Sequence, residues 1–259
     1  MTKTALDSKQ RFSSRVDAYV AARPRYPREI IPHLQKEIGL TPAWTLADLG
    51  SGTGISAELF LQNGNSVSGV EPNAPMRAAA EKSLRGFAKF KSINASAEHT
   101  TLPDHSIDLT LAAQAFHWFD IDATRKECRR ILNPTGWALL MWNDRLLRGS
   151  PFLEAYEKFL LAFGTDYEKV RHNNTGPDKL AGFFGSKNYR TAAFPNAQHL
   201  DYPGLRSRVL SSSYTPPPDH PNHAPMLADL QRLFDTHQQN NHIDILYKTE
   251  LFYGQPQKD

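Results

Sequence analysis

The chain has 259 residues, enough to bury one large α/β core or two small domains. Its 30 Lys and Arg side chains nearly balance 27 Asp and Glu, and no Lys/Arg run is present, which argues against a nucleic-acid-binding surface. The single cysteine, Cys128, excludes an internal disulfide and favours a reducing, cytoplasmic compartment, and the chain has neither a signal-peptide-like apolar N-terminus nor an apolar stretch of about 18 residues that could span a membrane.

Predicted strands and helices alternate between residues 44 and 142. Short apolar runs predict strands, and segments with helical spacing of apolar residues predict helices. We expect strands at 44–49, 66–70, 88–93, 107–113 and 137–142, and helices at 55–63, 74–84 and 122–132. The strands show little alternation, which is typical of strands buried on both faces of a parallel sheet. With right-handed crossovers, this order predicts a doubly wound α/β fold with helices on both faces of a mostly parallel sheet.

Residues Asn133–Gly136 predict a turn before the strand at 137–142. Beyond residue 142, the alternation of predicted strands and helices is less regular. There we expect helices at 152–163, 203–213 and 224–238, and strands at 187–194 and 248–253 as a terminal antiparallel pair. The sequence therefore predicts a single domain over residues 1–259, in which 41–142 form the core and 143–259 add a cap and the last strands.

A glycine-rich turn follows the first predicted strand. Residues 48–54 read Asp-Leu-Gly-Ser-Gly-Thr-Gly, and these glycines let the backbone bend sharply and approach a ligand. Glu71 ends the second strand about twenty residues later, where its carboxylate can accept hydrogen bonds from both hydroxyls of a ribose. A tight turn without a ligand and a surface glutamate are the alternatives for each feature alone. Their combination predicts a site for a ribose-containing ligand.

These two motifs and three later segments resemble the class I S-adenosylmethionine-dependent methyltransferases, more narrowly the small-molecule group that includes trans-aconitate-type enzymes. The segments that carry the resemblance are 48–54, 70–73, 96–98, 114–120 and 132–136. The resemblance implies a Rossmann-like fold with a seven-stranded sheet. It also implies S-adenosylmethionine as the cofactor and residues 41–142 as the cofactor-binding core.

The resemblance assigns the cofactor to residues that follow the first four strands. Gly50 and Gly52 would approach the methionine part, Asp48 would orient its amino group or a water, and Glu71 would hold the ribose. Many relatives carry Asp where this chain has Ser96, and a serine hydroxyl would bond the adenine amino group without charge. The implied cofactor-binding residues of this region are Asp48, Gly50, Ser51, Gly52, Glu71, Pro72, Met76, Ser96, Ala97, Glu98 and Gln114.

The first 40 residues are rich in aromatic and arginine side chains. We interpret residues 1–40 as a helical lid over cofactor and substrate, with a solvated leader helix as the alternative. In a lid, Arg23 could pair with the carboxylate of methionine or of an acidic substrate. Tyr19 could contact the sulfonium, because an aromatic face stabilises a cation.

Methyl transfer from a sulfonium is an in-line displacement, so the protein must mainly align the acceptor and exclude water. A base is needed only where the acceptor must lose a proton. His117, after the fourth strand, is the candidate catalytic base, and the equal alternative is that it only shapes the pocket. We predict no metal site, because no His-Glu-x-x-His motif is present and His220 and His223 lie in a proline-rich loop with no cysteine and no cluster of acids nearby.

The predicted function is therefore S-adenosylmethionine-dependent methyl transfer to a small organic acceptor, with no nucleic-acid or membrane partner. A nicotinamide-dependent oxidoreductase is an alternative that the glycine spacing disfavours. A nucleic-acid methyltransferase is another, although adenine-directed enzymes commonly carry Asn/Asp-Pro-Pro-Tyr/Phe where this chain has residues 114–117. A cofactor-binding protein without transfer activity is the third. The acceptor atom and the oligomeric state are left open at this stage.

Overall fold

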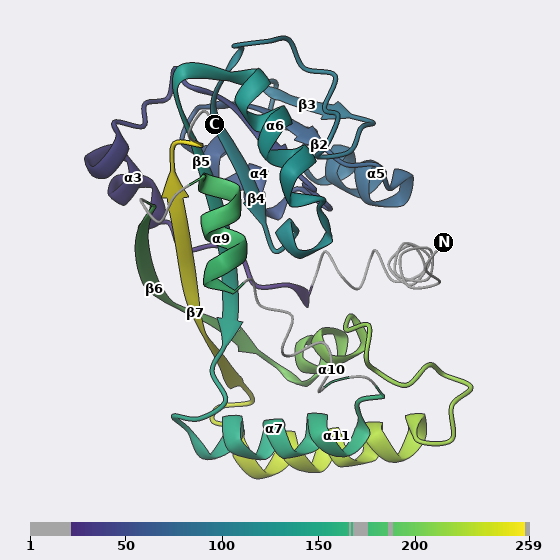
Figure 1. Ribbon diagram of the computed structural model, residues 1–259. Coiled ribbons are helices and arrows are strands. Elements are labelled where there is room, and N and C mark those ends of the chain that lie inside the picture. The colour runs from purple at the N-terminus through teal and green to yellow at the C-terminus, as the bar shows by residue number, and fades with distance from the viewer. Residues whose placement is uncertain (1–21, 166, 168–175, 186–188, 257–259) are drawn as a thin grey trace. The chain divides into compact units, whose positions relative to one another are not determined.

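The computed structural model describes residues 22–165, 167, 176–185 and 189–256. None of the helices in these ranges is long and apolar enough to cross a membrane. The elements are shown in Figure 1 and run in the order α3 (Ile30–Ile38), β1 (Thr45–Leu49), α4 (Ile55–Gln62), β2 (Ser66–Val70), α5 (Ala74–Ser83), β3 (Phe90–Ile93), β4 (Ile107–Ala113), η1 (Phe116–Trp118), α6 (Ile121–Ile131), β5 (Leu132–Arg145), α7 (Pro151–Phe163), α9 (Pro177–Phe184), β6 (Arg190–Leu200), α10 (Tyr202–Leu210), α11 (His223–His237) and β7 (Ile243–Gly254).

Seven strands form one sheet in the order β3-β2-β1-β4-β5-β7-β6. The strand β1 pairs in parallel with β2 and β4, as does β2 with β3 and β4 with β5. The arrows of β5 and β7 point in opposite directions in Figure 1. The predicted doubly wound, mostly parallel, seven-stranded sheet is confirmed. Its strand order reverses between β1 and β4, and such a switch point is where open α/β sheets bind ligands.

Helices cover both faces of this sheet because successive side chains of a strand point to opposite faces. On one face, Leu46 of β1 packs in a cluster with Ile30 of α3 and Phe60 of α4. On the other face, Leu49 packs in a cluster with Ile131 of α6 and with residues of α9. Figure 1 shows α6 and α9 side by side, in agreement with their residue contacts. The strands β1, β2 and β4 are thus buried on both sides, as predicted, whereas the edge strand β3 has no buried residue.

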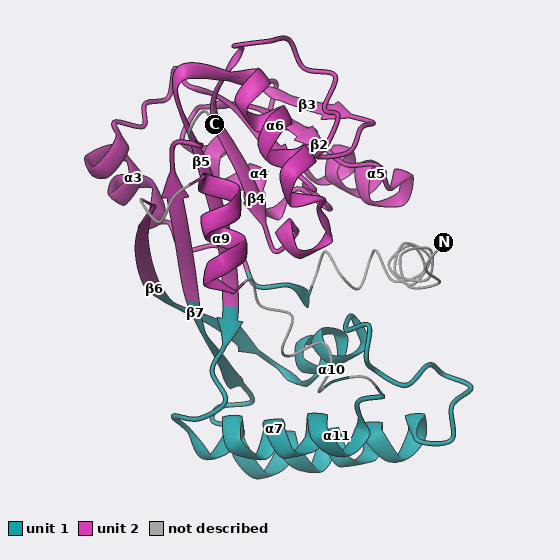
Figure 2. Cartoon of the chain, in the orientation of Figure 1, with its two compact units in different colours: residues 1–24, 144–174, 195–248 teal, residues 25–143, 175–194, 249–259 magenta. Residues whose placement is uncertain are grey.

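The chain divides into two compact units, which Figure 2 shows in different colours. The larger unit comprises residues 25–143, 175–194 and 249–259, and the smaller one 1–24, 144–174 and 195–248. The smaller unit has its own apolar core, built from α7, α10, α11 and β7. Residues 1–21 of the predicted lid lie outside the described residues.

The strand β5 differs from its prediction. It begins at Leu132, so the predicted turn at Asn133–Gly136 lies within the strand. Its register with β4 shifts between the pairs Ile107–Leu132 and Leu109–Trp137. The extra residues on β5 form a bulge, which is where a strand tolerates Pro134 and Gly136.

Three other segments of the chain also differ. The strand β7 begins at Ile243, before the predicted start at residue 248. The strand β6 runs on to Leu200, although Pro195 and Asn196 read as the end of a strand. Its residues alternate between half-buried and exposed, so no apolar run marks its length. The helix α9 was not predicted. It begins at Pro177, a residue favoured in the first turn of a helix, and buries Leu180, Phe183 and Phe184.

Hydrogen bonds to Glu127 of α6 hold the loop before β4 against this helix, and we call this set of bonds the Glu127 clip. Its side chain is 6% exposed, and it accepts hydrogen bonds from the amide and hydroxyl of Thr100 at 2.7 and 2.6 Å. Nε and Nη2 of Arg130 donate to it at 2.8 and 2.7 Å. Burial opposes the negative charge, but the bonds from Arg130 and Thr100 outweigh it and lower the pKa of Glu127 to about 2. The clip fixes Thr100, close after the segment 96–98.

We expect the Glu127→Gln variant to lose about 1–3 kcal/mol of unfolding free energy at neutral pH, because a carboxylate bonded to Arg130 and Thr100 is replaced by an amide. The folded-state pKa lies below the ordinary 4.5, so the wild-type advantage is complete above that pH and is lost as the pH falls toward 2. Urea denaturation at several pH values measures it. The exposed Glu81→Gln variant is the control, and equal stability of Glu127→Gln and wild type at neutral pH would contradict the clip.

Candidate functional site

The glycine turn and Glu71 follow the carboxyl ends of two neighbouring strands. The strands β1 and β2 pair in parallel up to Leu49 and Val70, so the residues that follow meet at one edge of the sheet. The amides of Gly50 and Ser51 both donate to the carbonyl oxygen of Val70, at 2.8 and 3.2 Å. The turn after β1 is therefore held against the end of β2.

The carboxylate of Glu71 bridges the two loops. It accepts hydrogen bonds from the amide of Gly52 at 3.1 Å and from the amide of Asn73 at 2.8 Å, one on each oxygen. Asn73 caps α5 by accepting from the amide of Met76 at 3.2 Å, and Arg77 donates to the Glu71 carbonyl oxygen at 2.8 Å. A carboxylate oxygen has two acceptor positions. Glu71 is thus fixed in place between the two loops.

The glycines of the turn serve different purposes. Gly50 and Gly52 have φ of 65° and 54°, in the left-handed region. A Cβ at Gly50 would lie 2.7 Å from the Cβ of Ala115, so this position must be glycine for the turn to pack against the segment after β4. A Cβ at Gly52 would meet no atom within 4 Å. The backbone at Gly52 therefore faces open space, as close approach of a ligand requires.

Asp48 is a fully buried acid at the start of this turn. The hydroxyl of Ser56 donates to its Oδ2 at 2.6 Å, while Oδ1 is buried and has no hydrogen-bond partner among the described residues. Burial raises the pKa of Asp48 to about 7; the bond from Ser56 opposes this, and the charge of Glu71 adds to it. This buried oxygen could accept a hydrogen bond from the amino group, or from the water, that the resemblance assigns to Asp48.

The predicted adenine-side residues follow β2 and β3 in the same unit. Met76 and Ala97 are buried and expose little surface, whereas Pro72 is exposed. The carbonyl oxygen of Ser96 accepts from the amide of His99 at 3.2 Å. Pro72, Ser96 and Ala97 lie in the segments that follow β2 and β3, and Met76 lies in the first turn of α5.

The carboxylate of Glu98 accepts a hydrogen bond from the amide of Asp120 at 3.1 Å. Asp120 is the N-cap of α6, and its side chain accepts from the amide of Ala123. Glu98 therefore joins the loop after β3 to the start of α6, and one of its carboxylate oxygens is partly committed to the protein.

The segment after β4 begins with Gln114 in a left-handed conformation, with φ of 58°. Its amide donates to the Met141 carbonyl oxygen at 3.0 Å, and its side-chain amide donates to the Asn143 carbonyl oxygen at 3.2 Å. These bonds tie the turn to β5 and fix the direction in which η1 leaves the sheet.

His117 and Trp118 lie in η1, with ring centroids 4.7 Å apart. The Trp118 side chain is 55% exposed, which is unusual for an indole and suits contact with a ligand. Burial lowers the pKa of His117 to about 4, and the positive charge of Lys179 in α9 lowers it further. The imidazole is therefore neutral at physiological pH.

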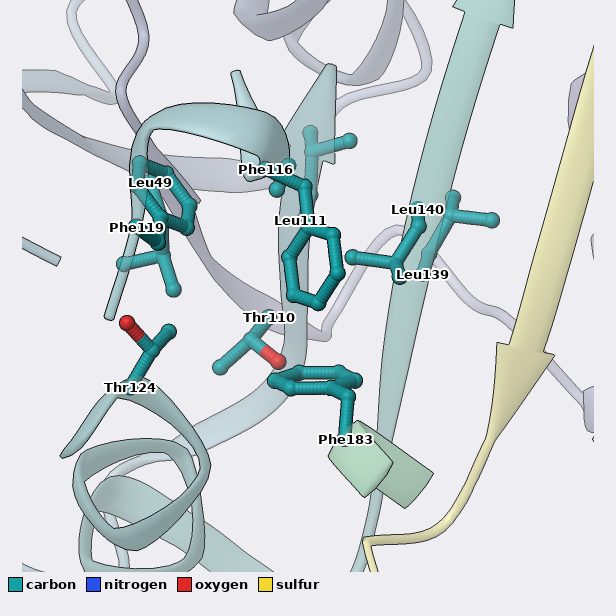
Figure 3. A pocket seen from close by; sticks show the side chains of 10 residues that line it. Leu49, Thr110, Leu111, Phe116, Phe119, Thr124, Leu139, Leu140 and Phe183 are labelled. Carbon is teal, nitrogen blue, oxygen red and sulfur yellow. The ribbon is translucent and has the colours of Figure 1, made fainter. Parts of the chain in front are cut away.

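An apolar pocket adjoins η1, and Figure 3 shows its lining. Phe116 and Phe119, which flank His117, line it together with Phe183 of α9 and residues of β4 and β5. The rings of Phe116 and Phe183 meet edge to face at 5.0 Å. The pocket is too small for a water molecule. It is packing that supports the His117 segment, not a ligand site.

The two predicted residues of the N-terminal segment are not brought to this edge by any described contact. Tyr19 lies outside the described residues. Arg23 belongs to the smaller unit, where its Nη2 donates to the Ser211 carbonyl oxygen at 3.3 Å. In the described ranges, no group of three His, Cys, Asp or Glu side chains could hold a metal ion.

Sequence reasoning missed three side chains that shape this site, Ser56, Arg77 and Lys179, whereas Phe119 was already part of the segment 114–120. Ser56 and Arg77 lie in the first turns of the helices after β1 and β2, and polar residues there are a signal that could have been used. The ring of Phe119 lies against Gly50, where a Cβ atom would contact it. Lys179 acts on His117 from a helix far along the chain, and no local pattern connects them.

Comparisons with known proteins show that the chain belongs to the methyltransferases. A family model described as "Methyltransferase domain" matches residues 47–140. An uncharacterized methyltransferase of Mycobacterium tuberculosis is 34% identical over 178 residues, which cover 69% of each chain. A protein of Schizosaccharomyces pombe described as uncharacterized and methyltransferase-like is 28% identical over 255 residues, or 93% of each chain.

A solved structure shares the fold. The protein from Anaeromyxobacter dehalogenans, named as a "Putative Type II Methyltransferase", superposes with a TM-score of 0.60 at 19% identity. The match covers 92% of this chain and 99% of that chain. The similarity therefore extends beyond the core matched by the family model.

We expect the Asp48→Asn variant to lack a pH-dependent loss of stability that the wild type shows. Because the pKa of Asp48 in the folded chain, about 7, lies above its ordinary 3.8, the wild type loses stability as the pH rises from about 4 through 7, on the order of 4 kcal/mol at most. Urea denaturation of both proteins across this range measures the difference. The exposed Asp219→Asn variant is the control, and parallel curves for wild type and Asp48→Asn would contradict the prediction.

We expect the imidazole of His117 to titrate with a midpoint near pH 4, well below the ordinary 6.5. A Lys179→Met variant removes one of the two causes and raises this midpoint, while burial keeps it below 6.5. Histidine ring signals in two-dimensional NMR, assigned with a His117→Gln variant, give both values. An exposed-lysine control, Lys158→Met, leaves the midpoint unchanged. A wild-type midpoint near 6.5 would show that the ring is solvated.

Proposed function

We propose that this chain, which belongs to the methyltransferases, binds S-adenosylmethionine at the carboxyl ends of β1 and β2 and transfers the methyl group to a small organic acceptor. The observation that carries the proposal is the arrangement of Asp48, Gly52 and Glu71 around one turn. Asp48 has a buried carboxylate oxygen without a hydrogen-bond partner among the described residues, Gly52 has backbone that no side chain covers, and the carboxylate of Glu71 is held in place by backbone amides.

These residues fit the proposed cofactor by the type of group that each presents. A ribose offers hydroxyl donors, and Glu71 is a carboxylate acceptor whose position two backbone amides fix. An amino acid moiety offers an ammonium, and Oδ1 of Asp48 is an acceptor without a partner. Gly50 and Ser51 hold the turn against β2, so that Gly52 presents bare backbone.

Further along the same edge, we propose that Met76 and Ala97 contact the adenine. They are buried, so they would contribute the ends of their side chains and not a broad surface. Ser96, Glu98, Pro72 and Gln114 complete the proposed set. The roles of Tyr19 and Arg23 in a lid are part of the same proposal and rest on the family resemblance.

When bound, the cofactor supplies an activated methyl group on a sulfonium. The chain has to align the acceptor and exclude water. Trp118 offers an apolar surface beside His117 for this purpose. Because His117 is neutral at physiological pH, one of its ring nitrogens can accept a proton, but its low pKa makes it a weak base. We therefore propose that His117 serves only an acceptor that gives up its proton easily, or shapes the pocket where no proton is lost.

We propose a small-molecule acceptor in preference to a nucleic acid. The formal charge of +3 is only a small excess of cations for contact with a phosphate backbone, and residues 114–117 do not carry the motif of adenine-directed enzymes. A reducing, cytoplasmic setting belongs to the same proposal. It is supported by Cys128, a lone thiol in the core whose pKa burial raises to about 12.

Isothermal titration with S-adenosylmethionine tests the proposal. We expect saturable binding to the wild type, and about tenfold or greater weakening in Glu71→Gln, because a charged acceptor for two hydroxyls becomes a neutral one. The matched control is Glu81→Gln, which changes an exposed glutamate of α5 and should bind as the wild type does. No binding of S-adenosylmethionine at millimolar concentration would refute the proposed function, and binding of NADH in its place would favour an oxidoreductase.

A further inference from the structure

Two histidine rings of the smaller unit lie against one another. His199 is in β6 and His242 immediately precedes β7, and their ring centroids are 4.2 Å apart with the rings nearly parallel, at 7°. The side chain of His199 is 66% exposed, and His242 is half-buried. Both residues belong to the segment 195–248, so the pair lies wholly within one compact unit and is accessible to a dissolved ion.

A tight turn fixes the backbone of His242. Asn240 and Asn241 both have positive φ, at 51° and 63°, as the two central residues of a type I′ hairpin turn require. The amide of Gln239 donates to the carbonyl oxygen of His242 at 2.8 Å, and the amide of His242 donates to that of Gln239 at 3.0 Å. These bonds close the turn and hold His242 at a defined position beside His199.

The Nδ1 atom of each ring is bonded to an oxygen that can only accept. Nδ1 of His199 lies 2.8 Å from Oδ1 of Asp244, and Nδ1 of His242 lies 2.9 Å from the carbonyl oxygen of Asn240. Both Nδ1 atoms must therefore carry the proton, and in the neutral ring Nε2 then holds a lone pair. Neither Nε2 atom makes a hydrogen bond to a residue in the described ranges.

This arrangement is typical of an imidazole that binds a metal ion. A metal-ligating histidine almost always donates its other ring N–H to a carboxylate or a carbonyl oxygen, which fixes the tautomer and the orientation of the ring. Each Zn–N bond is about 2.0–2.1 Å long, so one ion requires its two nitrogens within about 4 Å of each other. Rings with centroids 4.2 Å apart meet this requirement once they turn about the soft Cβ–Cγ bond and direct both lone pairs to one point.

We propose that Nε2 of His199 and Nε2 of His242 together bind one Zn²⁺ ion, with water molecules completing its coordination. Zn²⁺ is among the divalent ions that imidazole suits. Asp244 and the carbonyl oxygen of Asn240 position the rings and are not ligands. In the part of the chain that the structure describes, no third His, Cys, Asp or Glu completes a metal-binding group, so the site is open.

The two ligands come from different strands, so no spaced motif of the sequence indicates the pair. The ion would join β6 to the turn before β7 and hold these two segments of the smaller unit together. The inference does not depend on the proposed function, because neither histidine belongs to the proposed cofactor site.

Isothermal titration of the whole chain with zinc chloride, and in parallel with magnesium chloride, tests the site. We expect saturable binding of one Zn²⁺ and none of Mg²⁺, which prefers oxygen ligands. His199→Gln and His242→Gln should each weaken Zn²⁺ binding about tenfold or more, because one of two ligands is lost. Asp244→Asn should weaken it less, because an amide oxygen can still accept from Nδ1.

His105→Gln is the matched control and should bind Zn²⁺ as the wild type does. Nδ1 of His105 also bonds to a carbonyl oxygen, that of Leu132 at 2.9 Å, but within the described ranges its ring stacks on no second histidine.

Imidazole nitrogen signals in two-dimensional NMR identify the ligating atoms. Zn²⁺ should shift the Nε2 signals of both His199 and His242 and leave both Nδ1 atoms protonated. Binding should also weaken as the pH falls from about 8 to about 5, because protons compete with the ion for Nε2.

Circular dichroism establishes that each variant is folded. Should His242→Gln disturb the turn, His199→Gln, which lies outside it, decides the matter. Weaker Zn²⁺ binding by His199→Gln, with both Nε2 signals shifted in the wild type, supports the inference. No Zn²⁺ bound by the wild type, equal binding by wild type and His199→Gln, or unchanged Nε2 signals of the two rings would overturn it.

Discussion

The site depends on the parallel pairing of β1 with β2. Because Leu49 and Val70 are register partners, the amides of Gly50 and Ser51 reach the last carbonyl oxygen of β2, and Glu71 reaches the amide of Gly52. A slip of one residue would turn every side chain of the strand to the opposite face, and the two clusters that bury both faces oppose such a slip. The core of the larger unit therefore sets the geometry of the proposed cofactor site.

Two buried acids of the larger unit have opposite electrostatic environments. Glu127 receives bonds from an arginine and from a backbone amide and hydroxyl, so its charge is stabilised and its pKa falls to about 2. Asp48 is buried with an orphaned oxygen, so its pKa rises to about 7. Burial alone does not decide the charge of an acid; the supply of donors does. Glu127 accordingly has a structural role, whereas Asp48 has a buried oxygen without a hydrogen bond, to which a ligand could donate.

Much of the larger unit could be predicted because its signals are local. The strands at 66–70 and 107–113 were predicted to the residue, since apolar runs buried on both faces end at glycine, proline or polar turns. Loops at the carboxyl ends of these strands then follow from the topology. The extension of β6 past Pro195 could not be predicted, because its residues are half-buried or exposed and form no apolar run. The helix α9 could not be predicted because it is short. The neutral state of His117 was equally hidden, since burial and Lys179 set it through contacts remote in sequence.

The low pKa of His117 limits which acceptors its imidazole can serve. Burial and the charge of Lys179 both disfavour the protonated ring, so His117 is a weak base. A weak base suits an acceptor that loses no proton, or one that gives up its proton easily. The environment of this one ring therefore bears on the chemistry of the proposed acceptor, although no local sequence pattern connects His117 with Lys179.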